Sequence, residues 1–163
     1  MSRREKTGKT LAMRVLEDQN VPYERIEFPE SVHDALGVAE HAGVPAEHVY
    51  KTLVVEADDP DFKPMLFLVA AGRTLNLKMA ARAVGAKKVH MARQVDAEHL
   101  TGLKVGGISA LALLNRGFPV YLDAPATRLD FIVVSAGRRG LNLRLGVDDF
   151  IRVTGARVVT VTD

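Results

Sequence analysis

Cysteine is absent from the sequence, and this one absence excludes several kinds of chemistry. Without cysteine the chain forms no disulfide, offers no thiolate ligand to a metal and has no thiol nucleophile. Long apolar runs are missing as well. The strongest, MLFLVAA at 65–71, has the length of a strand, whereas a helix that crosses a membrane needs about 20 apolar residues. We therefore expect no membrane span.

Neither sign of charge is in large excess. Lysine and arginine number 22 against 20 acidic residues, which leaves a net charge of +2. This balance is compatible with nucleic-acid binding without requiring it, and the basic clusters at 3–9, 87–93 and 138–144 are either solvated faces or contacts to a polyanion. The charged start MSRREKTGKT lacks the apolar core of a signal peptide, so we expect a cytoplasmic protein.

The composition is that of a globular protein, since 47% of the 163 residues are hydrophobic. A chain of this length usually forms one domain, and we expect a single domain over 1–163. Periodicity and breaker residues predict helices at 10–19, 34–43, 75–86, 94–102, 111–117 and 147–155. They predict strands at 23–28, 50–58, 64–72, 87–92, 118–124, 128–137, 138–146 and 156–163.

Several predicted strands follow one another without an intervening helix. This order favours an α+β (mixed α/β) fold over a doubly wound parallel sheet. We expect a mixed, mainly antiparallel sheet that curls into a partial barrel with flanking helices. Thr7 or Thr10 is expected to cap the first helix, and Asp34 and Gly43 to bound the second.

Familiar catalytic motifs are incomplete. GKT at 8–10 lacks the first glycine of a P-loop, because Arg3 stands there. Ser109 lies in G-x-S-x-L and so lacks the second glycine of a nucleophile elbow. The five histidines form no close metal-binding pair, and His33, in a predicted loop, receives no role. We expect neither a metal nor a cofactor.

The segment VYKTLVVE at 49–56 places Lys51 and Thr52 at the start of an apolar strand. A lysine there can lay its stem on apolar surface while its ammonium faces a cleft. In a cleft it would bind phosphate or a developing negative charge. An ordinary exposed lysine is the alternative.

The segment GGISA at 106–110 combines Gly106 and Gly107 with Ser109. Glycines let a ligand approach the main chain closely, and adjacent N–H groups can hold a carbonyl oxygen or a phosphate. A tight turn between two helices is the alternative.

The segment VVSAGRRGL at 133–141 ends a strand at Ser135 and continues into a loop that contains Gly137, Arg138 and Arg139. Paired arginines on such a loop suit phosphate or a nucleic-acid backbone. A basic hairpin turn is the alternative.

These three segments, in this order, resemble the YbaK family of aminoacyl-tRNA deacylases. KTLAMRVLEDQNVPYERIEF at 9–28 resembles the opening of that family, and the likeness continues through DDFIRVTGA at 148–156. The resemblance implies a mixed α/β fold around a barrel-like sheet. It also implies a trans-editing enzyme that hydrolyses mischarged aminoacyl-tRNA, with Cys-tRNA(Pro) as the typical substrate.

The resemblance assigns roles to single residues. Lys51 matches the functional lysine of the family, Gly106 and Gly107 match its pocket glycines, and Ser135 matches a pocket serine. Phe28 stands where relatives often carry an aromatic residue. The partners implied are the aminoacylated acceptor end of tRNA and prolyl-tRNA synthetase.

A mechanism without an attacking atom from the enzyme fits this set of residues. In the YbaK branch the thiol of the substrate attacks its own ester. We expect main-chain N–H groups around 106–109 to hold the carbonyl oxygen and Lys51, with Thr52 beside it, to orient the terminal adenosine or its phosphate. Lys104 is expected to join the two arginines at 138–139 on the acceptor stem.

Ala110 departs from the pattern, because relatives carry proline there, and it leaves the amino-acid specificity open. One alternative is therefore a deacylase of Ala- or Ser-tRNA that uses water. Two further alternatives are a non-catalytic adaptor that binds RNA or a synthetase, and an unrelated small-molecule pocket.

Overall fold

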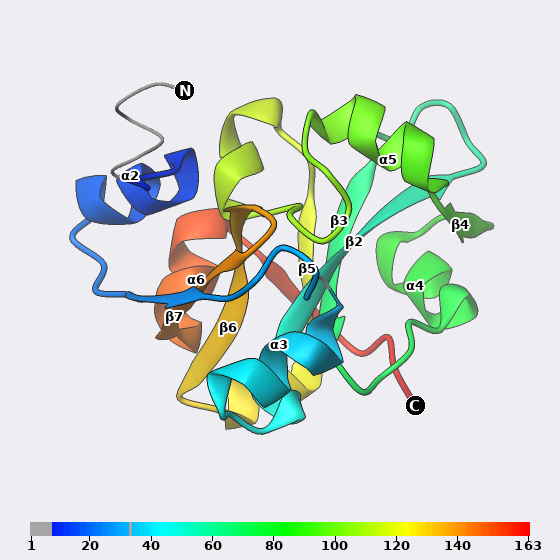
Figure 1. Cartoon of the computed structure of the whole chain (residues 1–163). Coiled ribbons are helices and arrows are strands. Elements are labelled where there is room, and N and C mark those ends of the chain that lie inside the picture. The colour runs from blue at the N-terminus through cyan, green and yellow to red at the C-terminus, as the bar shows by residue number, and fades with distance from the viewer. Residues whose placement is uncertain (1–7, 33) are drawn as a thin grey trace.

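The strands form two sheets, and helices cover them (Figure 1). The computed structural model describes residues 8–32 and 34–163. In one sheet the strand order is β1-β7-β6, and in the other it is β4-β2-β3-β5-β8. The strands are β1 (Glu24–Glu27), β2 (Tyr50–Ala57), β3 (Met65–Ala70), β4 (Val89–Met91), β5 (Val120–Asp123), β6 (Phe131–Arg138), β7 (Leu141–Gly146) and β8 (Arg157–Val159). The helices are α2 (Leu11–Asp18), α3 (Ala35–Ala42), α4 (Leu77–Val84), α5 (Gln94–Thr101) and α6 (Val147–Thr154), with 3-10 turns η1 (Ala46–His48), η2 (Leu111–Arg116) and η3 (Ala124–Arg128).

The predicted α+β class is confirmed, and the predicted curl into a partial barrel is wrong. Four of the six ladders between the described strands are antiparallel, while β3-β5 and β5-β8 are parallel. The two sheets meet at an isolated parallel bridge between Val49 and Val133. Beyond this bridge, side chains of β2 and β6 line one cavity. A ladder cannot continue across that space, so the sheets stay separate.

The sequence signals for helix ends act as predicted. The Thr10 side chain accepts a hydrogen bond from the Met13 N–H at the start of α2, while Thr7 lies outside the described residues. Gly43 closes α3 in the left-handed conformation at φ 69°, which glycine adopts without a steric penalty. Asp34 occupies the cap position of α3 without a side-chain cap bond.

The predicted helix at 111–117 forms a 3-10 helix, η2, instead of an α-helix. The Leu113 N–H donates to the Ala110 carbonyl three residues earlier, and Gly117 ends the turn in the left-handed region. The hydroxyl of buried Ser109 also accepts the Ala112 N–H at 3.2 Å. Side-chain and short-range bonds thus satisfy this segment within a single tight element.

The core lies on both faces of the larger sheet. Every residue of β3 is buried, as expected for a central strand. Successive residues of β2 alternate between the two cores: Val54 packs with Leu66 and Leu68 towards α2 and η2, and Val55 packs with Phe67 towards α4. This alternation fixes the register of β2, and therefore the place of the polar residues at its start.

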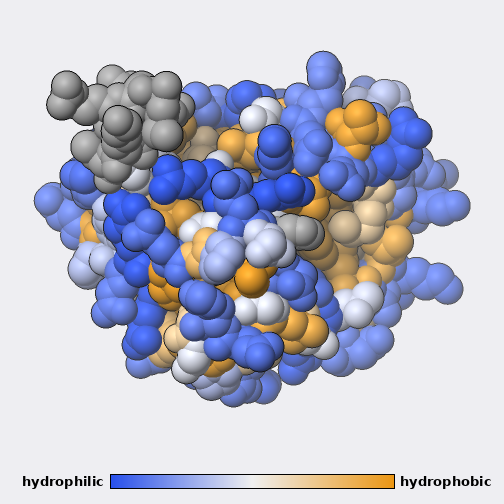
Figure 2. All heavy atoms as spheres, viewed as in Figure 1, coloured by the Kyte–Doolittle hydropathy of each residue, from blue (hydrophilic) through white to orange (hydrophobic). Residues whose placement is uncertain are grey.

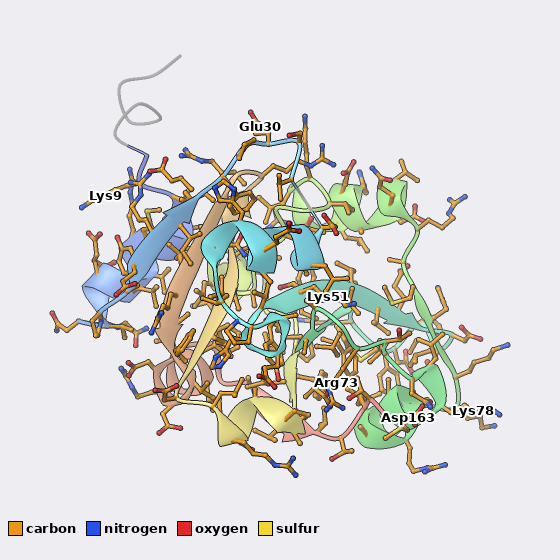
Figure 3. All side chains as sticks on the ribbon, turned by 60° about the horizontal axis from the view of Figure 1, so that its bottom comes forward. Lys9, Glu30, Lys51, Arg73, Lys78 and Asp163 are labelled. Carbon is orange, nitrogen blue, oxygen red and sulfur yellow. The ribbon has the colours of Figure 1, made fainter. Side chains whose placement is uncertain are left out.

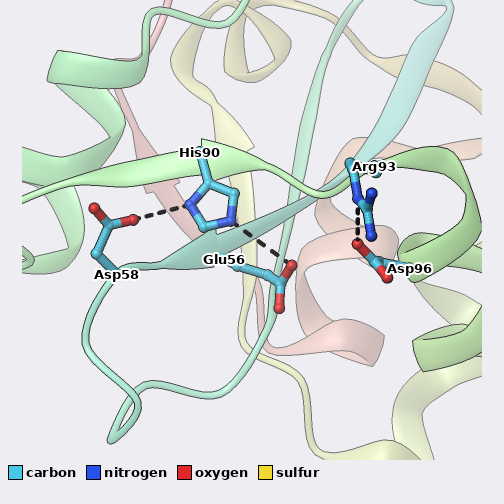
Figure 4. A network of polar contacts seen from close by, with 5 residues as sticks. All are labelled: Glu56, Asp58, His90, Arg93 and Asp96. Carbon is cyan, nitrogen blue, oxygen red and sulfur yellow. Dashed lines mark hydrogen bonds and ion pairs between the residues drawn. The ribbon is translucent and has the colours of Figure 1, made fainter.

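The edge strand β4 is short and carries polar contacts on its exposed side (Figure 4). The ring of His90 lies between two carboxylates, with Nδ1 2.9 Å from Asp58 Oδ1 and Nε2 3.8 Å from Glu56 Oε1. Arg93 and Asp96 form a second ion pair at 2.9 Å. Charged side chains of this kind discourage another strand from pairing with the edge.

Hydrophilic residues cover most of the face seen in Figure 2, with smaller apolar areas between them. Among the helices formed by residues 8–32 and 34–163, none has the length and apolar character needed to cross a membrane.

Candidate functional site

A cavity of about 440 Å³ lies where the two sheets meet. One wall comes from the start of β2, the opposite wall from β6 and β7, and the rims from the first turn of α3 and the loop 105–108. The lining residues are Asp34, Ala35, Leu36, Val38, Tyr50, Lys51, Thr52, Leu53, Ala71, Val105, Gly106, Ile108, Ser135 and Asn142. Cavities of this size are typical of small-ligand sites.

Lys51 supplies the cation of the cavity. Its Nζ donates to the carbonyl oxygens of Arg73 at 2.7 Å and Ala71 at 3.2 Å. Both carbonyls belong to the turn that follows β3. Burial lowers the pKa of Lys51 below its ordinary value, because leaving water disfavours the charged form. Two of the three ammonium N–H groups are therefore committed to the protein, and one remains for a ligand.

Two buried hydroxyl groups on the β2 wall have no hydrogen-bond partner in the part of the chain that the structure describes. The Oη atom of Tyr50 and the Oγ1 atom of Thr52 are both buried, and neither has a hydrogen-bond partner within 8–32 and 34–163. Burial, followed by the charge of Asp123, raises the pKa of Tyr50 to about 12. An unpaired buried hydroxyl costs about 1–3 kcal/mol, so these two groups are suited to a bound polar ligand.

Ser135 and Asn142 face the cavity from the smaller sheet. They are directly paired across β6 and β7. The Ser135 hydroxyl accepts the Gly137 N–H at 3.2 Å and keeps its own proton to donate. Asn142 is only 6% exposed, and its side-chain amide has no hydrogen bond to any other described residue. This wall thus offers both donors and an acceptor.

The loop 105–110 presents main-chain amides beside the cavity. Gly106 lines the cavity at φ 92°, a conformation that favours glycine. The N–H groups of Gly106, Ile108 and Ser109 find no acceptor in the described part of the chain. The Gly107 N–H differs, because it donates to the Lys104 carbonyl at 2.7 Å.

Charged side chains hold this loop at Val105. The Val105 N–H donates to Glu98 Oε2 at 2.8 Å, and the Val105 carbonyl accepts from Arg139 Nε at 2.7 Å. Gly107 then packs on the backbone of Arg138 and Arg139. Bonds to charged groups are about twice as strong as neutral ones, so α5 and the β6-β7 turn fix the loop from two sides.

Four of the predicted site residues line the cavity: Lys51, Thr52, Gly106 and Ser135. Six do not. Gly107 and Ser109 are buried beneath the loop. Phe28 is buried against residues of α3 and β6, and Gly137 lies in a bulge of β6 that borders another cavity. Arg138 is exposed and Arg139 half-buried at the loop.

Sequence reasoning missed Tyr50, Asn142 and Glu98. Tyr50 precedes the lysine and reads as part of the apolar run. Asn142 sits between leucines on the side of β7 predicted to face water, and only the neighbouring sheet buries it. Glu98 reads as a solvated residue of α5 because its main-chain partner lies seven positions away. The alternation in LNLRL was the one available signal, and it pointed outwards for Asn142.

The fold matches that of two solved structures. One is a crystal structure described as "a putative trans-editing enzyme for prolyl tRNA synthetase", with a TM-score of 0.81, 23% identity and coverage of 100% of this chain and 99% of that one. A crystal structure of a hypothetical protein aligns with a TM-score of 0.85 at 20% identity, over 94% of this chain and 100% of the other. The chain therefore shares its fold with both of these proteins.

The sequence comparisons identify the family. Residues 29–153 match the aminoacyl-tRNA editing domain. A protein of Enterococcus faecalis named "Putative Cys-tRNA(Pro)/Cys-tRNA(Cys) deacylase EbsC" is 34% identical over 99% of this chain and 98% of its own length. A proline--tRNA ligase of Sulfurihydrogenibium is 31% identical over 82% of this chain and 23% of the ligase.

The chain belongs to the aminoacyl-tRNA editing domain family, which confirms the resemblance to YbaK proteins. It is accordingly an aminoacyl-tRNA deacylase, a hydrolase with aminoacyl-tRNA as its substrate class.

Proposed function

We propose that this protein clears cysteine from tRNA(Pro) by substrate-assisted deacylation in trans, with residues 1–163 acting as a single domain. The observation that carries the proposal is the arrangement in one cavity of the Lys51 ammonium and the main-chain amides of Gly106 and Ile108, which find no acceptor among the described residues. The full-length likeness to the E. faecalis protein supports cysteine as the amino acid. The absence of cysteine from this chain is compatible with a nucleophile that belongs to the substrate.

The chemical step is internal to the substrate. The thiol sulfur of the cysteinyl group attacks its own ester carbonyl carbon, an S–C bond forms, and the C–O bond to the ribose breaks. The thiol proton ends on the ribose oxygen, and water then opens the thiolactone to free cysteine. The protein has only to bind the ester in a reactive geometry and to stabilise negative charge on the carbonyl oxygen.

The residues divide this work. In our proposal the N–H groups of Gly106 and Ile108, which both line the cavity, supply the donors for the carbonyl oxygen. Lys51 uses its remaining N–H group for the ribose or phosphate of the terminal adenosine and stabilises the developing charge. In our proposal Thr52 and Ser135 contact the aminoacyl group from opposite walls, since both residues line the same cavity.

The tRNA backbone would lie across the exposed basic residues beside the loop. Lys104 and Arg138 are exposed, which suits phosphate contacts. Arg139 Nε donates to the Val105 carbonyl. We therefore propose that Arg139 acts mainly by holding the loop 105–110 in place and only secondarily by contacting a tRNA phosphate. Prolyl-tRNA synthetase is the proposed partner that releases the mischarged tRNA, and the likeness of this chain to part of proline--tRNA ligases supports it.

A deacylation panel tests the proposal. Cys-, Ala- and Ser-tRNA(Pro) are each incubated with the wild-type protein and with Lys51→Ala. We expect rapid release of cysteine, slow release of alanine and serine, and a loss of about 100-fold or more for Lys51→Ala, the size typical of removing one group that stabilises transition-state charge. Circular dichroism verifies that the variant is folded.

Each other outcome of the panel rejects a stated part of the proposal. Preferential release of alanine or serine would reject the substrate thiol as the nucleophile and indicate that water attacks the ester instead. If the protein binds the three substrates and hydrolyses none of them, the proposed activity is rejected and the non-catalytic adaptor is favoured. Activity of folded Lys51→Ala close to that of wild type removes Lys51 from the mechanism.

A further inference from the structure

Asp123 is a carboxylate with no exposed surface, at the end of β5. Its Oδ1 accepts the Val161 N–H at 3.0 Å, and its Oδ2 accepts the Thr162 hydroxyl at 2.5 Å. A buried charge is expensive unless hydrogen bonds replace its water. Both bonds come from the segment 160–163, which leaves the β8 ladder after Val159. The buried carboxylate therefore anchors this segment.

The anchored segment in turn holds the turn after β3. Arg73 Nη1 donates to Thr162 Oγ1 at 3.3 Å and to the Asp163 carbonyl at 3.0 Å. The Asn76 N–H donates to the Val161 carbonyl at 2.8 Å. Figure 3 shows Lys51, Arg73 and Asp163 in the same part of the molecule. Because the exposed side chain of Arg73 has these partners, its main chain is held at a defined place.

That main chain carries the acceptor for the Lys51 ammonium. The Arg73 carbonyl lies 2.7 Å from Lys51 Nζ, and the Ala71 carbonyl from the same turn lies 3.2 Å from it. Hydrogen bonds thus connect Asp123 to Thr162, Thr162 to the Arg73 guanidinium, and the Arg73 carbonyl to Lys51. The covalent structure of Arg73 joins the last two.

We propose that Asp123, Thr162 and Arg73 are positioning residues, which set the place of the Lys51 ammonium in the cavity through the turn 71–73. The inference rests on the proposed function only in that Lys51 acts on the substrate. None of the three lines the cavity, so their effect on turnover passes through Lys51. A displacement of about 1 Å in a reacting or stabilising group can cost about 100-fold in rate. Hydrogen bonds that limit the movement of Lys51 are therefore expected to have a large effect on the rate of deacylation.

The test compares two replacements of Thr162. Thr162→Val keeps the shape of the side chain and removes the hydroxyl that joins Asp123 to Arg73, whereas Thr162→Ser keeps the hydroxyl. Thr154→Val is the matched control. The Thr154 hydroxyl, at the end of α6, likewise donates one hydrogen bond, to the Phe150 carbonyl, and accepts one, from the Ala156 N–H, and neither bond leads to Lys51. Thermal unfolding of all three variants measures the loss of stability.

Two readouts separate positioning from stability. The first is the lysine ammonium resonance in ¹H–¹⁵N spectra of the full chain, assigned to Lys51 by its disappearance in Lys51→Ala. We expect this resonance to shift or broaden in Thr162→Val and to stay in place in Thr162→Ser and Thr154→Val. The second is deacylation, for which we expect kcat to fall about 10-fold in Thr162→Val with KM little changed, and to recover in Thr162→Ser.

The outcomes distinguish this inference from the proposed function. An unchanged Lys51 resonance in Thr162→Val, or the same shift in Thr154→Val, overturns the inference whatever the activity. A shifted resonance in a protein that deacylates none of the panel retains the structural link and rejects the function. If Thr162→Val is unfolded, Arg73→Gln takes its place with Arg73→Lys as the conservative variant, and the same two readouts decide.

Discussion

Gly107 packs directly on the main chain of Arg138. A Cβ atom placed on Gly107 would lie 2.8 Å from the Arg138 carbonyl carbon and 2.8 Å from the Arg139 nitrogen. Because these are backbone atoms, no side chain can turn aside to make room. The glycine thus lets the loop 105–110 and the β6-β7 turn approach as one layer.

Gly107→Ala is therefore expected to push the loop away from the turn. Overpacking of this kind costs about 1–3 kcal/mol of the free energy of unfolding, and we expect deacylation to fall with it because the amides of the loop move. Urea unfolding and the cysteine-release assay measure both effects. Gly146→Ala is the control, since its added methyl group would make only ordinary contacts, with the Asp149 carboxylate at 3.4 Å and the Asp130 carbonyl oxygen at 3.7 Å. Unchanged stability of Gly107→Ala would contradict the packing argument.

The two arginines of the turn are expected to respond differently. Arg138 is exposed and Arg139 bonds to Val105. Arg138→Gln should weaken tRNA binding and lower the slope of log affinity against log salt by about 1, as for the loss of one phosphate contact. Arg139→Gln should keep that slope and lower kcat, because the loop loses its charged donor. Arg157→Gln, on the edge strand β8, serves as the basic control. Equal slopes for all three variants would remove Arg138 from the tRNA interface.

Tyr50→Phe is expected to raise stability and lower activity together. The hydroxyl is buried without a partner among the described residues, so its removal should stabilise the fold by about 1 kcal/mol. If the hydroxyl binds the aminoacyl group, kcat/KM should fall about fivefold to tenfold. Tyr23→Phe loses a 2.6 Å bond to Glu17 instead, and should not gain stability. A stabilised, fully active Tyr50→Phe would exclude the hydroxyl from binding.

The same replacement should alter the alkaline limit of stability. The pKa of Tyr50 is raised from 10.0 to about 12, chiefly by burial. Its neutral form therefore contributes stability that is complete below about pH 10 and is lost as the pH rises through about 12. Thermal unfolding between pH 9 and pH 12 should show a shallower decline for Tyr50→Phe than for the wild type.

Ala110→Pro is expected to stabilise the protein without changing amino-acid preference. Ala110 already has φ −62°, which is the angle that proline imposes, and its N–H finds no acceptor in residues 8–32 and 34–163. Fewer conformations in the unfolded chain should raise stability by about 0.4–1 kcal/mol. The ratio of Cys- to Ala-tRNA(Pro) deacylation should stay constant, and a changed ratio would assign specificity to this position.

Local signals were sufficient to predict where the described strands and α-helices lie, whereas η2 was predicted as an α-helix and η3 was not predicted. Gly43, Gly85 and Gly102 end helices in the left-handed conformation, as glycines at these places predict. The division into two sheets was not predictable, because it depends on how far β2 and β6 stay apart after Val49. Strand periodicity reports which face of a strand is apolar and carries no information on its non-sequential neighbours.

The same limit applies to the site. Lys51 and Gly106, which line the cavity, could be proposed from the sequence because a cation and a glycine stand out in an apolar run. Gly107 and Ser109 stand out equally, yet they serve packing and a local bond. The contribution of Thr162 was invisible, because its partners Asp123 and Arg73 are 39 and 89 positions away in the sequence.

The cavity takes its two walls from different sheets, with Thr52 on one side and Ser135 on the other. The width of the cavity therefore depends on how the two sheets pack against each other. A methyl group gained or lost in the interior between them is expected to change that width. If the cavity holds the aminoacyl group as proposed, such changes give evolution a route to a new amino-acid preference that leaves every lining residue untouched.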